Sequence, residues 1–219
     1  IRSGPSWPTS QASCAAIESA SSPAIESPSS FRHTISPKAA SPTATNNRSV
    51  RKLLFVFGTR PEAVKLCPVI RLLQQDPEFQ ISVCVTAQHR HLLDQVLAAF
   101  EVRPGHDLDL MRPNQTLAET ASRMIGGLDP VLKAESPDMA VVQGDTATTL
   151  SGALAAFYRR IPVAHVEAGL RTHDVSQPFP EEMNRVLTSR IASLHFAATT
   201  GAADNLMREG VPRRLVAVT

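Results

Sequence analysis

The stretch MAVVQGDTATTLSGALAAFYRRIPVAHVEAG, residues 139–169, decides the fold that we predict. Its two apolar runs, residues 139–143 and 162–166, are short and rich in Val and Ala, which is typical of buried strands. Residues 146–158 between them have the length and composition of a helix. A strand, a helix and a second strand in this order form a βαβ unit with parallel strands.

The same alternation continues on both sides of this unit, from Arg51 onward, with an irregular stretch at residues 103–114. We predict further strands at residues 53–57, 81–85 and 194–198 and one starting at Leu215, and helices at residues 62–75, 91–100, 116–133, 180–192 and 201–209. Repeated βαβ units with right-handed crossovers give an α/β fold, a Rossmann-like doubly wound parallel sheet. Ligands of such sheets bind outside the carboxyl ends of the strands.

Residues 1–49 differ in composition from residues 50–219. Ser, Ala and Pro dominate them, and apolar residues follow no fixed period, so we predict a disordered tail before one Rossmann-like domain. An organellar transit peptide is an alternative, although Glu18 and Glu26 and the many prolines count against it. We expect the native domain to start near Val50 and residues 1–49 to be either translated upstream sequence or a remnant of cloning.

Composition and charge argue against several classes of partner. The 22 Lys and Arg residues are scattered among 20 Asp and Glu residues, so no basic stripe favours nucleic acid. No apolar run approaches the roughly 18 residues of a membrane span, so we expect no membrane partner. Three widely spaced cysteines, Cys14, Cys67 and Cys84, favour neither disulfides nor a zinc site. A reducing cytoplasm fits this pattern best.

Two cations follow the first predicted strand. Arg60 and Lys65 lie beside the start of the next helix, where backbone N–H groups favour anions. Solvated surface cations are an equally good interpretation. The chain has neither a Gly-x-Gly-x-x-Gly nor a Walker lysine motif, which disfavours a conventional dinucleotide or P-loop site.

A polar cluster containing Gln88 and His89 follows the second predicted strand. It is either a ligand contact or an ordinary polar cap at a strand-to-helix junction.

Acidic residues follow two strands at the same predicted edge of the sheet. Asp145 ends one strand and Glu167 ends the next, and Glu181 and Glu182 begin the helix after that. Carboxylates that converge in a cleft raise one another's pKa and can divide acid and base roles, so we predict proton transfer here. Each acid alone could instead serve a helix N-terminus, Asp145 as a cap and the glutamates through the helix dipole.

Four motifs together resemble those of the bacterial non-hydrolysing UDP-N-acetylglucosamine 2-epimerases. They are FGTRPEAVK (57–65), VTAQHRHLLDQVL (85–97), VVQGDTATTLSGALAAFYRRIPVAHVEAGLRT (141–172) and PFPEEMNRVLTSRIASLHF (178–196). The resemblance implies a glycosyltransferase-B architecture of two Rossmann-like domains, of which this chain is the N-terminal half. It also implies C2 epimerisation of UDP-N-acetylglucosamine through elimination and re-addition of UDP, with no cofactor and no metal.

The resemblance also implies roles for individual residues. Asp145, Glu167 and Glu181 match the family's essential acids, with Asp145 and Glu167 also in contact with substrate. Arg60 and Lys65 match positions that contact the nucleotide sugar. Gln88 and His89 match a motif that contacts a second, activating nucleotide sugar in some members. Homodimers formed through the N-terminal domains, and a product that supplies cell-surface polysaccharide, are expected on the same ground.

Three alternatives stay open at this point: a hydrolysing 2-epimerase, a glycosyltransferase of the same fold and a non-catalytic fragment. The family's second domain, which holds most of the nucleotide, has no counterpart within the 219 residues. We therefore expect a truncated chain with little or no epimerase activity, because half of the cleft would be missing.

Overall fold

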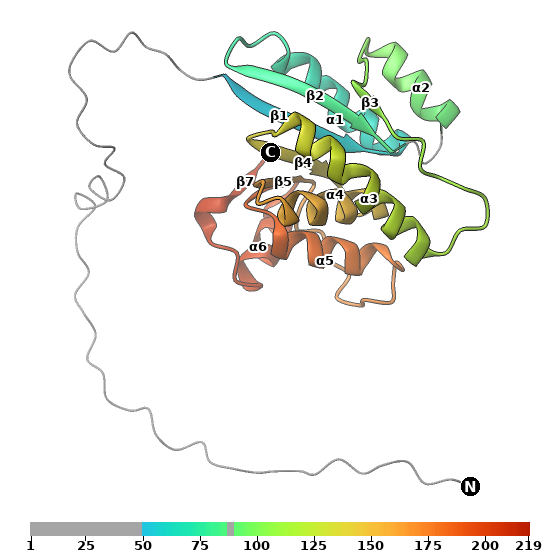
Figure 1. The fold of residues 1–219 in the computed structure, drawn as a ribbon. Helices are drawn as coiled ribbons and strands as arrows, with labels where there is room; N and C mark the ends of the chain where they lie inside the picture. The colour runs from blue at the N-terminus through green and yellow to red at the C-terminus, as the bar shows by residue number, and fades with distance from the viewer. Residues whose placement is uncertain (1–49, 87–89) are drawn as a thin grey trace, which may run out of the picture. The chain divides into compact units, whose positions relative to one another are not determined.

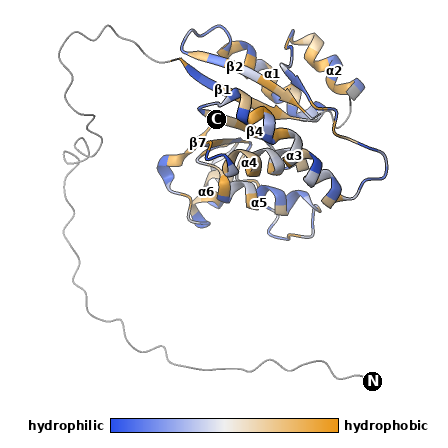
Figure 2. Ribbon diagram, in the orientation of Figure 1, coloured by the Kyte–Doolittle hydropathy of each residue, from blue (hydrophilic) through white to orange (hydrophobic). Residues whose placement is uncertain are grey.

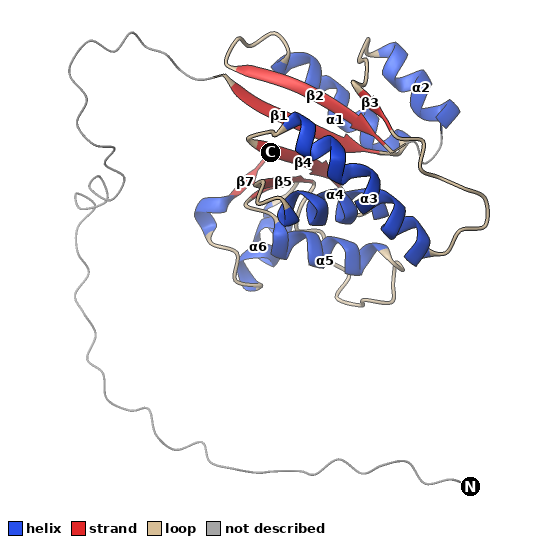
Figure 3. Ribbon diagram, in the orientation of Figure 1, coloured by secondary structure: helices blue, strands red, loops and turns tan. Residues whose placement is uncertain are grey.

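The structure, a computed structural model, describes residues 50–86 and 90–219. Strands and helices alternate along this part of the chain (Figures 1 and 3). The strands are β1 (Arg51–Phe57), β2 (Phe79–Val85), β3 (His106–Asp107), β4 (Met139–Gln143), β5 (Val163–Val166), β6 (Leu194–Ala197) and β7 (Val216–Val218). The helices are α1 (Arg60–Leu73), α2 (Arg90–Ala99), α3 (Leu117–Glu135), α4 (Ala147–Tyr158), α5 (Glu181–Ile191) and α6 (Thr200–Arg208), with a short 3-10 helix at Arg213–Leu215.

The seven strands form one parallel sheet in the order β3-β2-β1-β4-β5-β6-β7. The predicted βαβ unit is present, since β4 and β5 pair in parallel with Val141 opposite Ala164. The strand order reverses between β1 and β4, which are neighbours in the sheet although β2 and β3 separate them in the chain. Loops that follow β1 and β4 are therefore brought together at the carboxyl edge, where α/β proteins bind ligands.

Helices cover both faces of the sheet, which confirms the predicted doubly wound α/β class. Side chains of β1 alternate between the faces. Phe55 and Phe57 pack in one apolar cluster with α1 and α2, whereas Leu54 and Val56 pack in a second cluster with α3 and α4. In Figure 1, α5 and α6 follow α4 on the second face.

Local sequence signals explain where several elements begin. Thr59 caps α1 and forms a reciprocal capping box with Glu62, and Thr116 does the same with Glu119 for α3. α1 therefore starts at Arg60, two residues before the predicted position. The predicted irregular stretch at residues 103–114 contains the short strand β3, which pairs only with β2 at the sheet edge. Two residues are too few for a periodic signal.

Hydrophobic and hydrophilic residues alternate along the helices, as expected for elements with one face on the sheet (Figure 2). In the described part of the chain, no helix is long and apolar enough to cross a membrane.

Candidate active site

A pocket with a volume of about 310 Å³ lies at the carboxyl edge of the sheet. The loops after β1 and β4 and the end of β5 supply its walls, so the strand-order reversal positions it. The lining residues are Thr59, Pro61, Glu62, Lys65, Gln143, Gly144, Asp145, Thr146 and Glu167. Three of the predicted site residues, Lys65, Asp145 and Glu167, are thus brought together.

Glu167 enters the pocket from the end of β5. Its Oε2 lies 2.5 Å from Lys65 Nζ of α1 and also accepts a hydrogen bond from Gln143 Nε2. The backbone of Glu167 has φ +63°, a left-handed conformation that is unfavourable for a residue with a side chain. Such strained positions are concentrated at functional sites, because the surrounding structure must hold them in place.

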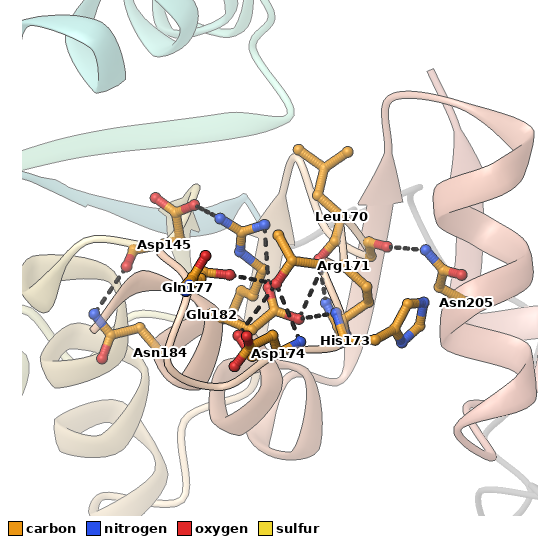
Figure 4. A network of polar contacts seen from close by, with 12 residues as sticks. Asp145, Leu170, Arg171, His173, Asp174, Gln177, Glu182, Asn184 and Asn205 are labelled. Atoms are coloured by element: carbon orange, nitrogen blue, oxygen red, sulfur yellow. Dashed lines mark hydrogen bonds and ion pairs between the residues drawn. The ribbon is translucent and has the colours of Figure 1, made fainter. Parts of the chain in front are cut away.

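Asp145 follows Gly144, whose φ of +76° turns the chain out of β4. The Asp145 Oδ2 accepts a hydrogen bond of 2.5 Å from Arg185 Nη2, and its backbone oxygen accepts one of 2.9 Å from Asn184 Nδ2 (Figure 4). Burial raises the pKa of Asp145, the Arg185 guanidinium opposes that rise, and the charges of Glu181 and Glu167 add to it. The charges of the other two predicted acids therefore both act on Asp145.

Glu181 and Glu182 are neighbours with different surroundings. Glu181 is partly exposed at the start of α5, and its charge contributes to the raised pKa of Asp145. Glu182 is 1% exposed, and its Oε1 accepts hydrogen bonds from the backbone N–H groups of Thr172 (3.0 Å) and His173 (3.1 Å). The sequence did not distinguish the two glutamates, but the structure does. Glu182 is buried and supports the loop after β5.

Glu62 was missed as a site residue by the sequence analysis. Its Oε2 accepts hydrogen bonds from the N–H groups of Gly58 and Thr59, both at 2.7 Å, and its Oε1 accepts one of 2.6 Å from Thr146 Oγ1. Burial raises the pKa of this carboxyl. Glu62 therefore joins the loop after β1 to the loop after β4 at the wall of the pocket. The signal that could have revealed it is the Thr-x-x-Glu capping box at residues 59–62.

Of the other predicted site residues, Arg60 and Glu181 do not line the pocket, and two lie outside the described residues. Arg60 is exposed at the start of α1 and does not line the cavity. Gln88 and His89 lie outside the described residues. No group of three or more His, Cys, Asp or Glu side chains in residues 50–86 and 90–219 is arranged to hold a metal ion.

Comparison with known proteins identifies relatives that share the chain's sequence as well as its fold. UDP-N-acetylglucosamine 2-epimerase of Yersinia pestis is 56% identical over 168 residues, which are 77% of this chain and 45% of the relative. The crystal structure of UDP-GlcNAc 2-epimerase from Neisseria meningitidis, bound to UDP-GlcNAc, aligns with a TM-score of 0.75 at 50% identity. That alignment covers 77% of this chain and 45% of the other. The chain thus spans about half the length of these relatives.

A lipopolysaccharide outer core galactosyltransferase also aligns, with a TM-score of 0.57 at 12% identity, a likeness that shows the fold alone. The family profile described as UDP-N-acetylglucosamine 2-epimerase matches residues 71–219. This match includes β2 and every element after it, together with Asp145, Glu167 and Glu181. The chain therefore belongs to the UDP-N-acetylglucosamine 2-epimerase family.

Proposed function

We propose that this chain provides the proton-transfer half of an enzyme that interconverts UDP-N-acetylglucosamine and UDP-N-acetylmannosamine without hydrolysis. The observation that carries the proposal is the pair of carboxylates Asp145 and Glu167 in one pocket, with Glu181 near enough for its charge to raise the pKa of Asp145. Inversion at C2 moves a proton off one face of the carbon and returns a proton to the other face. Two proton-handling groups are needed for this, and three carboxylates are at hand.

In the proposed reaction a carboxylate takes the C2 proton while the C1–O bond to UDP breaks, giving 2-acetamidoglucal and free UDP. A carboxylic acid then protonates C2 from the opposite face as UDP re-forms the bond to C1. Developing charge on the departing diphosphate requires cations nearby. Lys65 at the pocket and Arg60 at the start of the same helix suit that role. The chemistry as proposed uses neither a nicotinamide cofactor nor a metal ion.

Further expectations follow from this proposed function. The protein would act in the cytoplasm, on UDP-sugars that feed cell-surface polysaccharide, and the buried free thiols of Cys67 and Cys84 suit a reducing compartment. Gln88 and His89 would contact a second, activating nucleotide sugar. Assembly as a homodimer is proposed on the family resemblance.

The test is exchange of the C2 proton of UDP-N-acetylglucosamine in D2O, followed by NMR. The chain would be assayed alone and with the separately expressed C-terminal half of the Yersinia pestis relative, because the family site is expected to need both halves. We expect exchange in the combined sample and a loss of at least 100-fold, roughly the contribution of one acid or base, in Asp145→Asn, Glu167→Gln and Glu181→Gln.

The exposed acid Asp129, which pairs with Arg159 away from the pocket, gives the matched control Asp129→Asn with unchanged exchange. Folded samples that show no exchange in any combination would sink the proposal. Release of free N-acetylmannosamine in place of the nucleotide sugar would assign a hydrolysing reaction.

A further inference from the structure

A chain of polar contacts runs from the loop after β5, through α5, to Asp145 (Figure 4). The backbone N–H groups of Thr172 and His173 donate to Glu182 Oε1. Glu182 Oε2 lies 3.3 Å from Arg185 Nη1, and Arg185 Nη2 donates to Asp145 Oδ2 at 2.5 Å. The guanidinium therefore bridges two carboxylates, one buried and one at the pocket.

The middle of this chain is withdrawn from water. The side chain of Glu182 is 1% exposed and that of Arg185 is 12% exposed, whereas 31% of Asp145 is exposed. Glu182 and Arg185 are three residues apart on α5, so they lie on the same face of the helix. Burying two charges is costly, and an isolated pair contributes little net stability. The second contact of the guanidinium, to Asp145, suggests a task beyond holding the fold together.

Asp145 needs such a partner because other carboxylates face it. Glu167 at the end of β5 and Glu62 and Lys65 of α1 line the same pocket, and the charge of Glu181 at the start of α5 also raises the pKa of Asp145. Like charges that share a site favour protonation of one member. A guanidinium bonded to one oxygen of Asp145 counteracts that tendency and limits rotation of the carboxylate.

We propose that Arg185, held in place by Glu182, is a positioning residue that keeps Asp145 ionised and directs its Oδ1 toward the ligand. Within the described residues, the side-chain hydrogen bond of Asp145 is made by Oδ2, so Oδ1 is the atom left for proton transfer. The assignment of a proton-transfer role rests on the proposed function. The electrostatic role of Arg185 does not rest on it.

The test is a carbon-13 NMR titration of the Asp145 carboxyl in the 219-residue chain labelled at aspartate. Its signal is identified by its disappearance in Asp145→Asn. We expect Arg185→Gln to raise the midpoint by about one pH unit or more, because an opposite charge at this range lowers a carboxyl pKa by about 1 to 3 units. Arg185→Lys, which keeps the charge, should restore most of the wild-type midpoint.

Arg190→Met is the matched control, because Arg190 belongs to the same helix and its guanidinium bonds the backbone oxygen of Glu209 instead. It should leave the Asp145 midpoint unchanged. A folded Arg185→Gln chain with the wild-type midpoint would show that the contact is only structural and overturn the proposal.

A second measurement needs no substitution that could unfold the chain. The Arg185 Nε–Hε signal of the wild-type protein should shift with the same midpoint as the Asp145 carboxyl, and independence of the two signals would also overturn the proposal. No substrate is present in either titration, so failure here is distinguishable from failure of the epimerase proposal.

Discussion

Asp145 and Glu167 lie on the same pocket, but the cation beside each comes from a different environment. Asp145 is bonded to Arg185, which is 12% exposed and is also paired with the buried Glu182. Glu167 is bonded to Lys65, which is 47% exposed and projects from the first helix across the pocket. The Asp145 side of the pocket is therefore held in place by a largely buried cation. On the Glu167 side, the cation is an exposed lysine side chain.

This difference indicates how the two sides respond to a ligand. A buried guanidinium cannot leave its carboxylates without leaving charge unpaired, which is strongly unfavourable. An exposed lysine can exchange a carboxylate for a ligand anion at small cost, because solvated ion pairs contribute only about 0 to 1 kcal/mol. We expect the Asp145 side to be preorganised and the Lys65–Glu167 side to rearrange when an anion binds.

The strongest test of the fixed side is Glu182→Gln. The substitution leaves Arg185 without its buried partner, and we expect the free energy of unfolding to fall by about 3 kcal/mol. Urea denaturation followed by circular dichroism measures this. The adjacent Glu181→Gln is the matched control, because Glu181 is partly exposed, and we expect a change within about 0.5 kcal/mol. Equal losses in the free energy of unfolding would contradict the view that Glu182, and not Glu181, stabilises the fold.

On the other side of the pocket, Lys65→Met should change the free energy of unfolding by less than about 1 kcal/mol, because the Lys65 side chain is 47% exposed. The same denaturation experiment measures it, with Lys65→Arg as the control that retains the charge. A loss as large as that of Glu182→Gln would mean that Lys65 stabilises the fold as much as the buried pair does. The two sides of the pocket would then not differ in the way we propose.

Much of the fold was predictable because it depends on local pattern. The strand at residues 139–143 was predicted at its observed bounds, since this apolar run is short and lies between polar segments. The two-residue strand β3 was not predictable, because its pairing with β2 is a long-range contact that leaves no period in the sequence. The start of α1 was misplaced for a different reason, namely that the capping box at Thr59 was not recognised.

The site was predictable only in part, for a related reason. Topology brings strand ends together, so Asp145 and Glu167 could be placed at one edge from the sequence. The burial of a side chain depends on what packs over it, and sequence position alone cannot separate Glu181 from Glu182. Arg185 was likewise missed, because a cation three residues after a glutamate is common on exposed helices.

The smallest predicted effect is on the pH dependence of stability. Its sign shows whether folding favours the protonated or the ionised form of an acid. Burial raises the pKa of Asp145 despite Arg185. A carboxyl with a raised pKa stabilises the folded state fully only when the pH is below its pKa in the unfolded chain, about 3.9. This stabilisation is lost as pH rises through the pKa in the folded state. Asp145→Asn cannot titrate, so its stability relative to wild type should increase between about pH 4 and pH 7. The gain should be on the order of 0.5 kcal/mol, since solvent screens a partly exposed group.

The surface acid Asp129 supplies the opposite sign in the same measurement. A hydrogen bond from Arg159 lowers the pKa of Asp129, so its contribution is present above the pKa of the unfolded chain and is lost as pH falls. Asp129→Asn should therefore lose stability relative to wild type as pH rises toward about 4, below the range in which Asp145→Asn gains it. Urea denaturation at several pH values measures both. Parallel pH profiles for the two variants would mean that Asp145, like Asp129, is stabilised in its ionised form, and that Arg185 outweighs both burial and the neighbouring carboxylates.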